Sequence, residues 1–167
     1  MKRELADLIN NQINFEIFSA HIYLNISCYC AAEGYDGFRN WYEIQYQEEM
    51  THAKKFINYL LDNGYTPKIT NWDGNPGTNY SSLLETAQIS LMHEKEVTER
   101  IKYLMSKAVE DNDYATMSFL NWYIDEQIEE EATFDKMIQQ IKMVKDAGLY
   151  LLDKEYATRV FVDNTVK

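Results

Sequence analysis

Four glutamates that interrupt apolar helical stripes are the residues of this chain best suited to chemistry. Steps of three or four residues keep side chains on one helix face, and such steps place one acid in each of four stripes: Glu16, Glu49, Glu94 and Glu130. His52 follows Glu49 by three residues and shares its face. Because glutamate is rarely buried without a partner, each acid taken alone could be the solvated edge of its helix. Four such coincidences instead favour a buried carboxylate cluster that binds metal.

The ligand types indicate which metal and which chemistry such a cluster would support. Carboxylate oxygens with one imidazole suit iron or manganese better than zinc. Carboxylates at close range repel one another, so without cations some of them must take up protons. Two iron ions bridged by Glu49 or Glu130 could each give one electron to a shared O2 or peroxide. The residues therefore predict a di-metal centre that could carry out a two-electron reaction.

Long helices are the elements that must position these acids. All six glycines and both prolines lie between the periodic segments, and both residue types weaken helix interiors. The pattern predicts an all-α chain in which 1–167 form a single domain. The expected helices span about 4–33, 38–63, 82–110 and 113–145, with a short terminal helix at 149–160. A capping-box pattern from Ser82 to Glu85 supports the third start.

The connection from Gly64 to Ser81 is longer than the two to eight residues that usually join neighbouring bundle helices. Extended, it could reach ~60 Å, whereas the second helix would be only ~39 Å long. A crossover along the whole bundle is therefore possible and would make the second and third helices parallel. In that topology Glu49, Glu94 and Glu130 meet at mid-bundle. The level of Glu16 along the bundle axis depends on which residues form the first turn.

Composition narrows the classes of partner. The chain is 46% hydrophobic and 26% charged, and its formal charge of −11 comes from 27 acidic and 16 basic residues. This excess of negative charge disfavours nucleic acid and anionic membranes as partners and favours cations. No stretch of about 18 apolar residues could span a membrane, and the opening residues do not resemble a signal peptide. We therefore expect a cytoplasmic protein.

Four motifs follow one another along nearly the whole chain: Asn14-Phe15-Glu16 with Tyr23, the run from Gln47 to His52, His93-Glu94, and the run from Phe119 to Glu131. In order and in spacing they resemble the motifs of the bacterial non-haem ferritins. The resemblance implies a ferritin-like four-helix bundle with one long crossover and a short fifth C-terminal helix. It also implies iron ligands: an A site of Glu16, Glu49 and His52, and a B site of Glu94 and Glu130 that Glu49 bridges.

Further roles also follow from the resemblance alone. Gln127 would lie beside the B site, and a third iron would bind at Glu48, Glu126, Glu129 and Glu130. Glu126 and Glu129 could instead be part of a solvated acidic run. Tyr23 and Trp122 match aromatic residues thought to supply electrons, although either could be a core aromatic residue.

The resemblance implies an iron-storage ferritin and a ferroxidase. Such a protein forms a hollow homo-oligomer of 24 subunits, oxidises Fe2+ with O2 or H2O2, and stores ferric oxyhydroxide mineral. No haem is expected: the fourth helix lacks the second Glu-x-x-His of bacterioferritins, although Met50 matches their haem ligand. Met117 and Leu120 stand where animal ferritins carry channel acids, which leaves the iron entry route open. A rubrerythrin-like di-iron enzyme and a helical scaffold protein remain alternatives.

Overall fold

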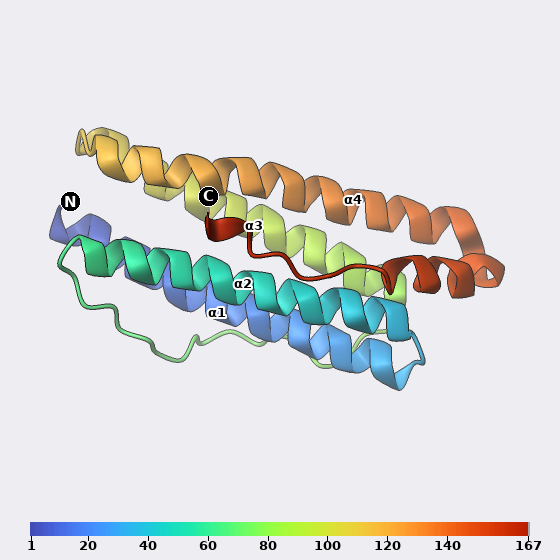
Figure 1. The fold of residues 1–167 in the computed structure, drawn as a ribbon. Coiled ribbons are helices and arrows are strands. Elements are labelled where there is room, and N and C mark those ends of the chain that lie inside the picture. Colours follow the sequence, from blue (N-terminus) through green and yellow to red (C-terminus); the bar gives the residue numbers. More distant parts are fainter. Residues whose placement is uncertain (167) are drawn as a thin grey trace.

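Four long helices make up most of the molecule (Figure 1). A computed structural model describes the backbone of residues 1–166, and the side chains of these residues except 145–147 and 166. The elements are α1 (Arg3–Ala32), α2 (Asp36–Asp62), α3 (Leu83–Glu110), α4 (Tyr114–Tyr156) and the short 3-10 helix η1 (Asn164–Val166). No strand occurs in the described part of the chain. The expected all-α class is confirmed.

The helices pack as two antiparallel pairs, α1 with α2 and α3 with α4, and α1–α3 and α2–α4 contacts join the pairs (Figure 1). Gly34, with a φ of 80°, makes the first tight turn, because glycine adopts positive φ at little cost. Asn112, with a φ of 52°, makes the turn before α4. Two tight turns and one long crossover leave α2 and α3 parallel, as the length of the crossover indicated.

The crossover is tied to α1 by side-chain amides. Asn10 and Asn14 each donate from Nδ2 to the carbonyl oxygen of Lys68, at 3.1 and 3.0 Å. The backbone N–H of Thr70 donates to Asn14 Oδ1 at 2.6 Å. Trp72 then packs edge-on against Phe15, with ring centroids 5.0 Å apart. These contacts fix the crossover beside the α1 segment that carries Glu16.

The expected separate helix at 149–160 is instead the last part of α4, which ends at Tyr156. The Tyr156 hydroxyl donates to Gln140 Oε1 at 2.7 Å, across 16 residues. In a straight helix these residues would lie ~24 Å apart, so the end of α4 must turn back toward the bundle (Figure 1). Asp153 Oδ1 accepts from the N–H groups of Gly37 and Phe38, at 2.9 and 3.0 Å. The returning segment thereby caps the start of α2.

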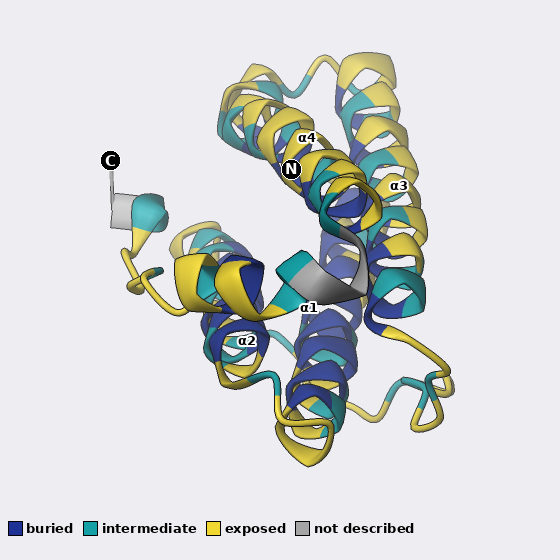
Figure 2. Cartoon of the chain, turned by 90° about the vertical axis from the view of Figure 1, so that its right-hand side faces the viewer, coloured by how far each residue is buried: buried dark blue, intermediate teal, exposed yellow. Residues whose placement is uncertain are grey.

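Buried residues lie on the inner faces of the helices (Figure 2). The apolar ones form two separate clusters. One contains Tyr23, Tyr42 and Phe134; the other contains Phe56 and Tyr123. Between them, every helix contributes buried polar side chains, which are Glu16, Gln45, Glu49, His52, Ser90, Glu94, Gln127 and Glu130. Burying polar groups costs free energy unless each finds a partner. This layer of buried polar side chains is therefore the candidate functional site.

None of the helices in the described residues is long and apolar enough to cross a membrane.

Candidate metal centre

The four stripe acids are buried, one on each helix. Glu16, Glu49 and Glu94 are each 1% exposed and Glu130 is 6% exposed. The alternative that these acids are solvated helix edges is therefore wrong. Glu16, whose height the sequence left open, lies at the same level as the others.

The first group of possible ligands is Glu16, Glu49 and His52. One ligand atom from each lies within 4.8 Å of the other two, and His52 Nδ1 is 3.6 Å from Glu49 Oε2. Glu16 Oε2 is buried and has no hydrogen-bond partner. A buried oxygen of this kind is costly unless a donor or a cation satisfies it. In the metal-free protein a proton retained by Glu16 can bond it to Glu49, and a cation would take the place of that proton.

A second group lies on the other side of the same imidazole. His52, Glu126 and Glu130 also offer ligand atoms within 4.8 Å of one another, and His52 Nε2 is 3.9 Å from Glu126 Oε1. Glu126 is only partly buried, unlike Glu130. The two ring nitrogens of His52 therefore face two different carboxylate groups.

Glu94 is held by two neighbours that the sequence already singled out. The Tyr23 hydroxyl donates to Glu94 Oε1, and Gln127 Nε2 donates to Glu94 Oε2 at 3.1 Å. Gln127 Nε2 also reaches the backbone carbonyl of Glu94 at 3.1 Å. Each carboxylate oxygen has two lone pairs, so these hydrogen bonds orient Glu94 and still leave acceptor capacity for a cation.

Two arginine–glutamine pairs support the acids from outside, and sequence reasoning missed both. Arg100 Nε donates to Gln12 Oε1, and Gln12 Nε2 donates to Glu16 Oε1, both at 2.8 Å. Because Arg100 binds the amide oxygen of Gln12, the amide NH2 group of Gln12 must point at Glu16. Ligand-orienting contacts of this kind tune metal sites.

The second pair involves Arg159 and Gln45. Arg159 Nη1 donates to Gln45 Oε1 at 3.0 Å, and Gln45 Nε2 donates to Glu130 Oε2 at 2.9 Å and to Glu49 Oε1 at 3.4 Å. Gln45 precedes Glu49 by four residues, as Gln12 precedes Glu16. That shared i, i+4 spacing is the signal that could have identified both glutamines.

The buried acids raise one another's pKa values. Burial, followed by the charge of Glu49, raises the pKa of both Glu16 and Glu94 to about 8. Burial, followed by the charge of Glu94, raises the pKa of Glu130 to about 8. The pKa of Glu49 is raised well above its usual value by burial and then by Glu130. At neutral pH the cluster therefore retains protons that a cation would displace.

The aromatic candidates lie beside these acids. Tyr23 is fully buried, and burial, followed by the charge of Glu94, raises the pKa of its hydroxyl well above the usual value. Trp122 is half-buried, with its ring edge-on to His52 at a centroid distance of 5.4 Å. His93 contributes to neither group: it is buried, its Nε2 is 2.7 Å from Ser19 Oγ, and burial, followed by Arg100, lowers its pKa to about 4.

The four acids expected to form a third site are not all together. Glu126 and Glu130 lie near His52. Glu48 forms an ion pair with Arg159, and Glu129 is exposed and belongs to neither group. Met50, the haem-ligand match, is 39% exposed on α2.

Comparisons with known proteins agree with this geometry. A family model described as a ferritin-like domain matches residues 6–144. A bacterial non-heme ferritin of Staphylococcus epidermidis is 44% identical over 163 residues, covering 96% of this chain and 98% of the relative. A bacterial non-heme ferritin of Staphylococcus aureus is 42% identical with the same coverage.

Solved structures show the same fold. A ferritin of Archaeoglobus fulgidus, engineered to a closed form by site-directed mutagenesis, matches with a TM-score of 0.93 and 35% identity, covering 97% of this chain and 99% of that one. The open pore ferritin of the same hyperthermophilic archaeon matches with a TM-score of 0.92 and 34% identity, covering 96% and 98%. This chain belongs to the ferritin family and is similar to its bacterial non-heme members.

Proposed function

We propose that this chain stores iron and is a ferroxidase, oxidising Fe2+ at a di-iron centre inside each subunit. The observation that carries the proposal is the buried group of Glu16, Glu49 and His52, whose ligand atoms lie within 4.8 Å of one another, while no side-chain or backbone donor satisfies Glu16 Oε2. An unsatisfied buried oxygen beside two more ligands is a donor set that lacks its cation. The similarity to named non-heme ferritins supports iron as that cation.

The residues of the centre would have different roles. Glu16, Glu49 and His52 would bind one Fe2+, and Glu94 and Glu130 would bind the second, with Glu49 between them. Gln127 and Tyr23 would hold Glu94 in place through their hydrogen bonds. The high pKa of Tyr23 keeps its proton on the phenol, so Tyr23 acts as a donor toward Glu94.

The electron balance explains why two irons are required. Two Fe2+ ions give one electron each to O2, and two protons complete H2O2; with H2O2 as oxidant, two electrons and two protons give two water molecules. Protons that Fe2+ displaces from Glu16, Glu94 and Glu130 are available for this step, because the pKa of each carboxyl is raised to about 8. The cluster would thereby supply both ligands and protons.

A third, weaker cation is proposed beside the Nε2 side of His52, where Glu126 and Glu130 lie. Glu48 and Glu129 remain predicted ligands for it. No haem is included in the proposal.

Assembly into a hollow cage of 24 copies would give the oxidised iron a place to form ferric oxyhydroxide mineral. Several large apolar side chains are exposed on the single subunit and would be available for contacts between subunits. They include Met92, Tyr114, Ile128, Met143, Tyr150 and Leu151. The net charge of −11 disfavours nucleic acid and anionic membranes as partners.

Aerobic addition of Fe2+ to the purified apoprotein, followed by near-ultraviolet absorbance and size exclusion, tests the whole proposal. Rapid oxidation well beyond two irons per chain, in a particle of about 24 chains, is the expected result. Oxidation that stops at about two irons in a small oligomer would indicate a di-iron enzyme instead. No oxidation would remove the ferroxidase assignment.

A further inference from the structure

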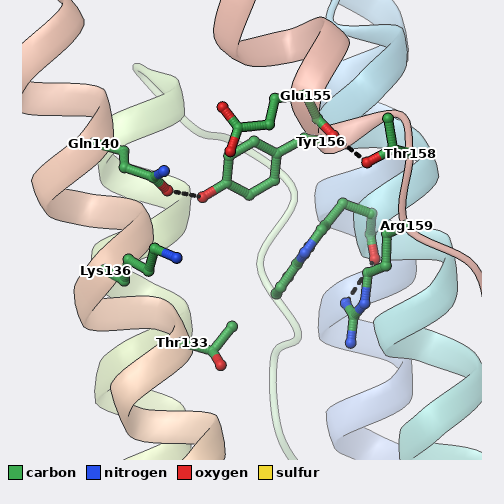
Figure 3. A pocket seen from close by; sticks show the side chains of 8 residues that line it. Thr133, Lys136, Gln140, Glu155, Tyr156, Thr158 and Arg159 are labelled. Carbon is green, nitrogen blue, oxygen red and sulfur yellow. Dashed lines mark hydrogen bonds between the residues drawn. The ribbon is translucent and has the colours of Figure 1, made fainter.

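Arg159 lies immediately beyond α4, beside the second group of ligands. It lines a pocket of about 290 Å³ and faces Thr133 and Lys136 of α4 across it (Figure 3). Its guanidinium stacks on the Trp41 ring, 4.2 Å from the ring centroid. Nη1 donates to the Trp41 carbonyl at 3.2 Å, and Nη2 forms an ion pair with Glu48. The guanidinium is thus held on three sides.

The backbone of this segment is also tied to α2, along which it runs (Figure 1). Asn40 Nδ2 donates to the carbonyl oxygen of Arg159 at 3.0 Å. Farther along, Lys55 Nζ donates to the carbonyl oxygen of Thr165 at 3.0 Å. These ties hold Arg159 in place over Glu48 without any contribution from its own charge.

Glu48 is the nearby acid that the second ligand group would most naturally recruit. A neutral imidazole has one lone pair, and His52 is already a proposed ligand of the first iron, so Glu126 and Glu130 are the ligands that this group has left. Iron and zinc take four or more ligand atoms. Glu48 adjoins Glu49 on α2 and is the one acid of these that Arg159 contacts directly, whereas Arg159 reaches Glu130 through Gln45. One Glu48 oxygen is already engaged by the guanidinium.

We infer that Arg159 is a built-in counter-ion for Glu48, and that a third metal ion competes with Arg159 for Glu48 and moves the guanidinium away as it binds. This inference rests on the proposed function, because it concerns the third cation beside the di-iron centre. A guanidinium and a divalent cation compete for the same carboxylate and repel each other at short range. Arg159 is therefore a positioning residue that keeps the third site weak and links its filling to the segment after α4.

Zn2+ titration of the apoprotein by calorimetry measures this competition, because Zn2+ accepts carboxylate and imidazole ligands without redox chemistry. Arg159→Met keeps an unbranched apolar stem against Trp41 but removes the charge. We expect this change to tighten binding of the third Zn2+ by about tenfold or more, since it frees a carboxylate and removes a neighbouring positive charge. The first two Zn2+ should bind no more tightly than in the wild type, because Arg159→Met also removes the hydrogen bond to Gln45, whose amide orients Glu49 and Glu130.

Three further variants separate competition from a general loosening of the segment. Arg159→Lys retains a cation and should leave the third site close to wild type. Arg39→Met removes an exposed arginine paired with Glu43 on the same helix and should change nothing. Adding Glu48→Gln to Arg159→Met should cancel the gain. An unchanged or weaker third site in Arg159→Met, or a gain that survives Glu48→Gln, would overturn the inference.

Trp41 fluorescence gives a second readout. In a Trp72→Phe, Trp122→Phe background, Trp41 is the sole tryptophan, and its emission should change with the third Zn2+ and not with the first two. A change confined to the first two equivalents, or no change at all, contradicts displacement of Arg159. Failure of the first two Zn2+ to bind would instead count against the proposed function, so the two failures are distinguishable.

Discussion

The two sides of the His52 ring lie in different surroundings. On the Nδ1 side, Glu16 and Glu49 are each 1% exposed, and one oxygen of Glu16 has no partner. On the Nε2 side, Glu126 is only partly buried, and nearby Glu48 already has a cationic partner in Arg159. Burial without a partner raises the free energy of the metal-free protein. A cation should therefore stabilise the protein more on the Nδ1 side of His52, the enclosed side, than on the Nε2 side, the open side.

Glu49→Gln should have the largest effect, because Glu49 takes part in the enclosed group and would bridge both irons. Rapid Fe2+ oxidation, measured by stopped-flow absorbance, should fall by about 100-fold or more, since even ligand-orienting neighbours can be worth that much. Glu43→Gln, an exposed acid on the same helix, should oxidise iron at the wild-type rate. Equal rates in the two variants would remove Glu49 from the site.

Lower pH should weaken metal binding on the enclosed side. The carboxyls of Glu16, Glu94 and Glu130 have pKa values raised from 4.5 to about 8, so a metal must displace their protons below pH 8. Apparent Zn2+ affinity should fall by about tenfold per pH unit for each proton displaced. Calorimetry in buffers of different ionisation enthalpy counts those protons, and a count of zero at pH 7 contradicts the prediction.

The same raised pKa values set the pH dependence of stability. The folded apoprotein retains protons that the unfolded chain releases, so this contribution is fully present below pH 4.5 and is lost as pH rises through about 8. The melting temperature of the apoprotein should fall across that window, and Zn2+ should reverse the fall. Glu94→Gln should flatten the slope; an identical slope in this variant would show that other groups cause it.

Gln12→Leu should have an intermediate effect. It removes the amide that orients Glu16 and leaves Arg100 with Asn11 Oδ1 as its remaining side-chain acceptor. We expect affinity for the first metal to fall by about tenfold, which is typical for loss of a ligand-orienting contact. Gln139→Leu, at an exposed glutamine that bonds Asp135, is the matched control and should bind metal normally.

Glu129→Ala should have the smallest effect. Glu129 is exposed and belongs to neither ligand group, so binding of the first two metals should change by less than about twofold, as for most surface substitutions. Total iron bound or turnover should change instead, if the residue serves a third site. Complete loss of oxidation would mean that Glu129 belongs to the enclosed side.

Much of the fold follows from local sequence. Glycine and proline positions predicted the ends of α1 and α2 to within two residues, because both residue types disfavour helix interiors. Ser82 forms the expected cap, accepting from the Glu85 N–H at 3.1 Å. Gly148 was interpreted as a break before a terminal helix; α4 is continuous to Tyr156, but it turns back between Gln140 and Tyr156.

Only those parts of the site could be predicted whose positions depend on residue spacing along a single helix. Residue spacing predicted that Glu49, Glu94 and Glu130 lie at one level of the bundle, because each residue adds a constant rise along a helix. Arg100 and Arg159 could not be found in this way. Each reaches the site through a glutamine on a different helix, and such contacts depend on the packing of segments far apart in sequence.

The most direct test of the central claim is a crystal structure of the protein soaked anaerobically in Fe2+, with iron located by anomalous scattering. Two iron peaks are expected in every subunit, one among Glu16, Glu49 and His52 and one between Glu94 and Glu130. Peaks confined to exposed acids, with the buried layer empty, would contradict the account.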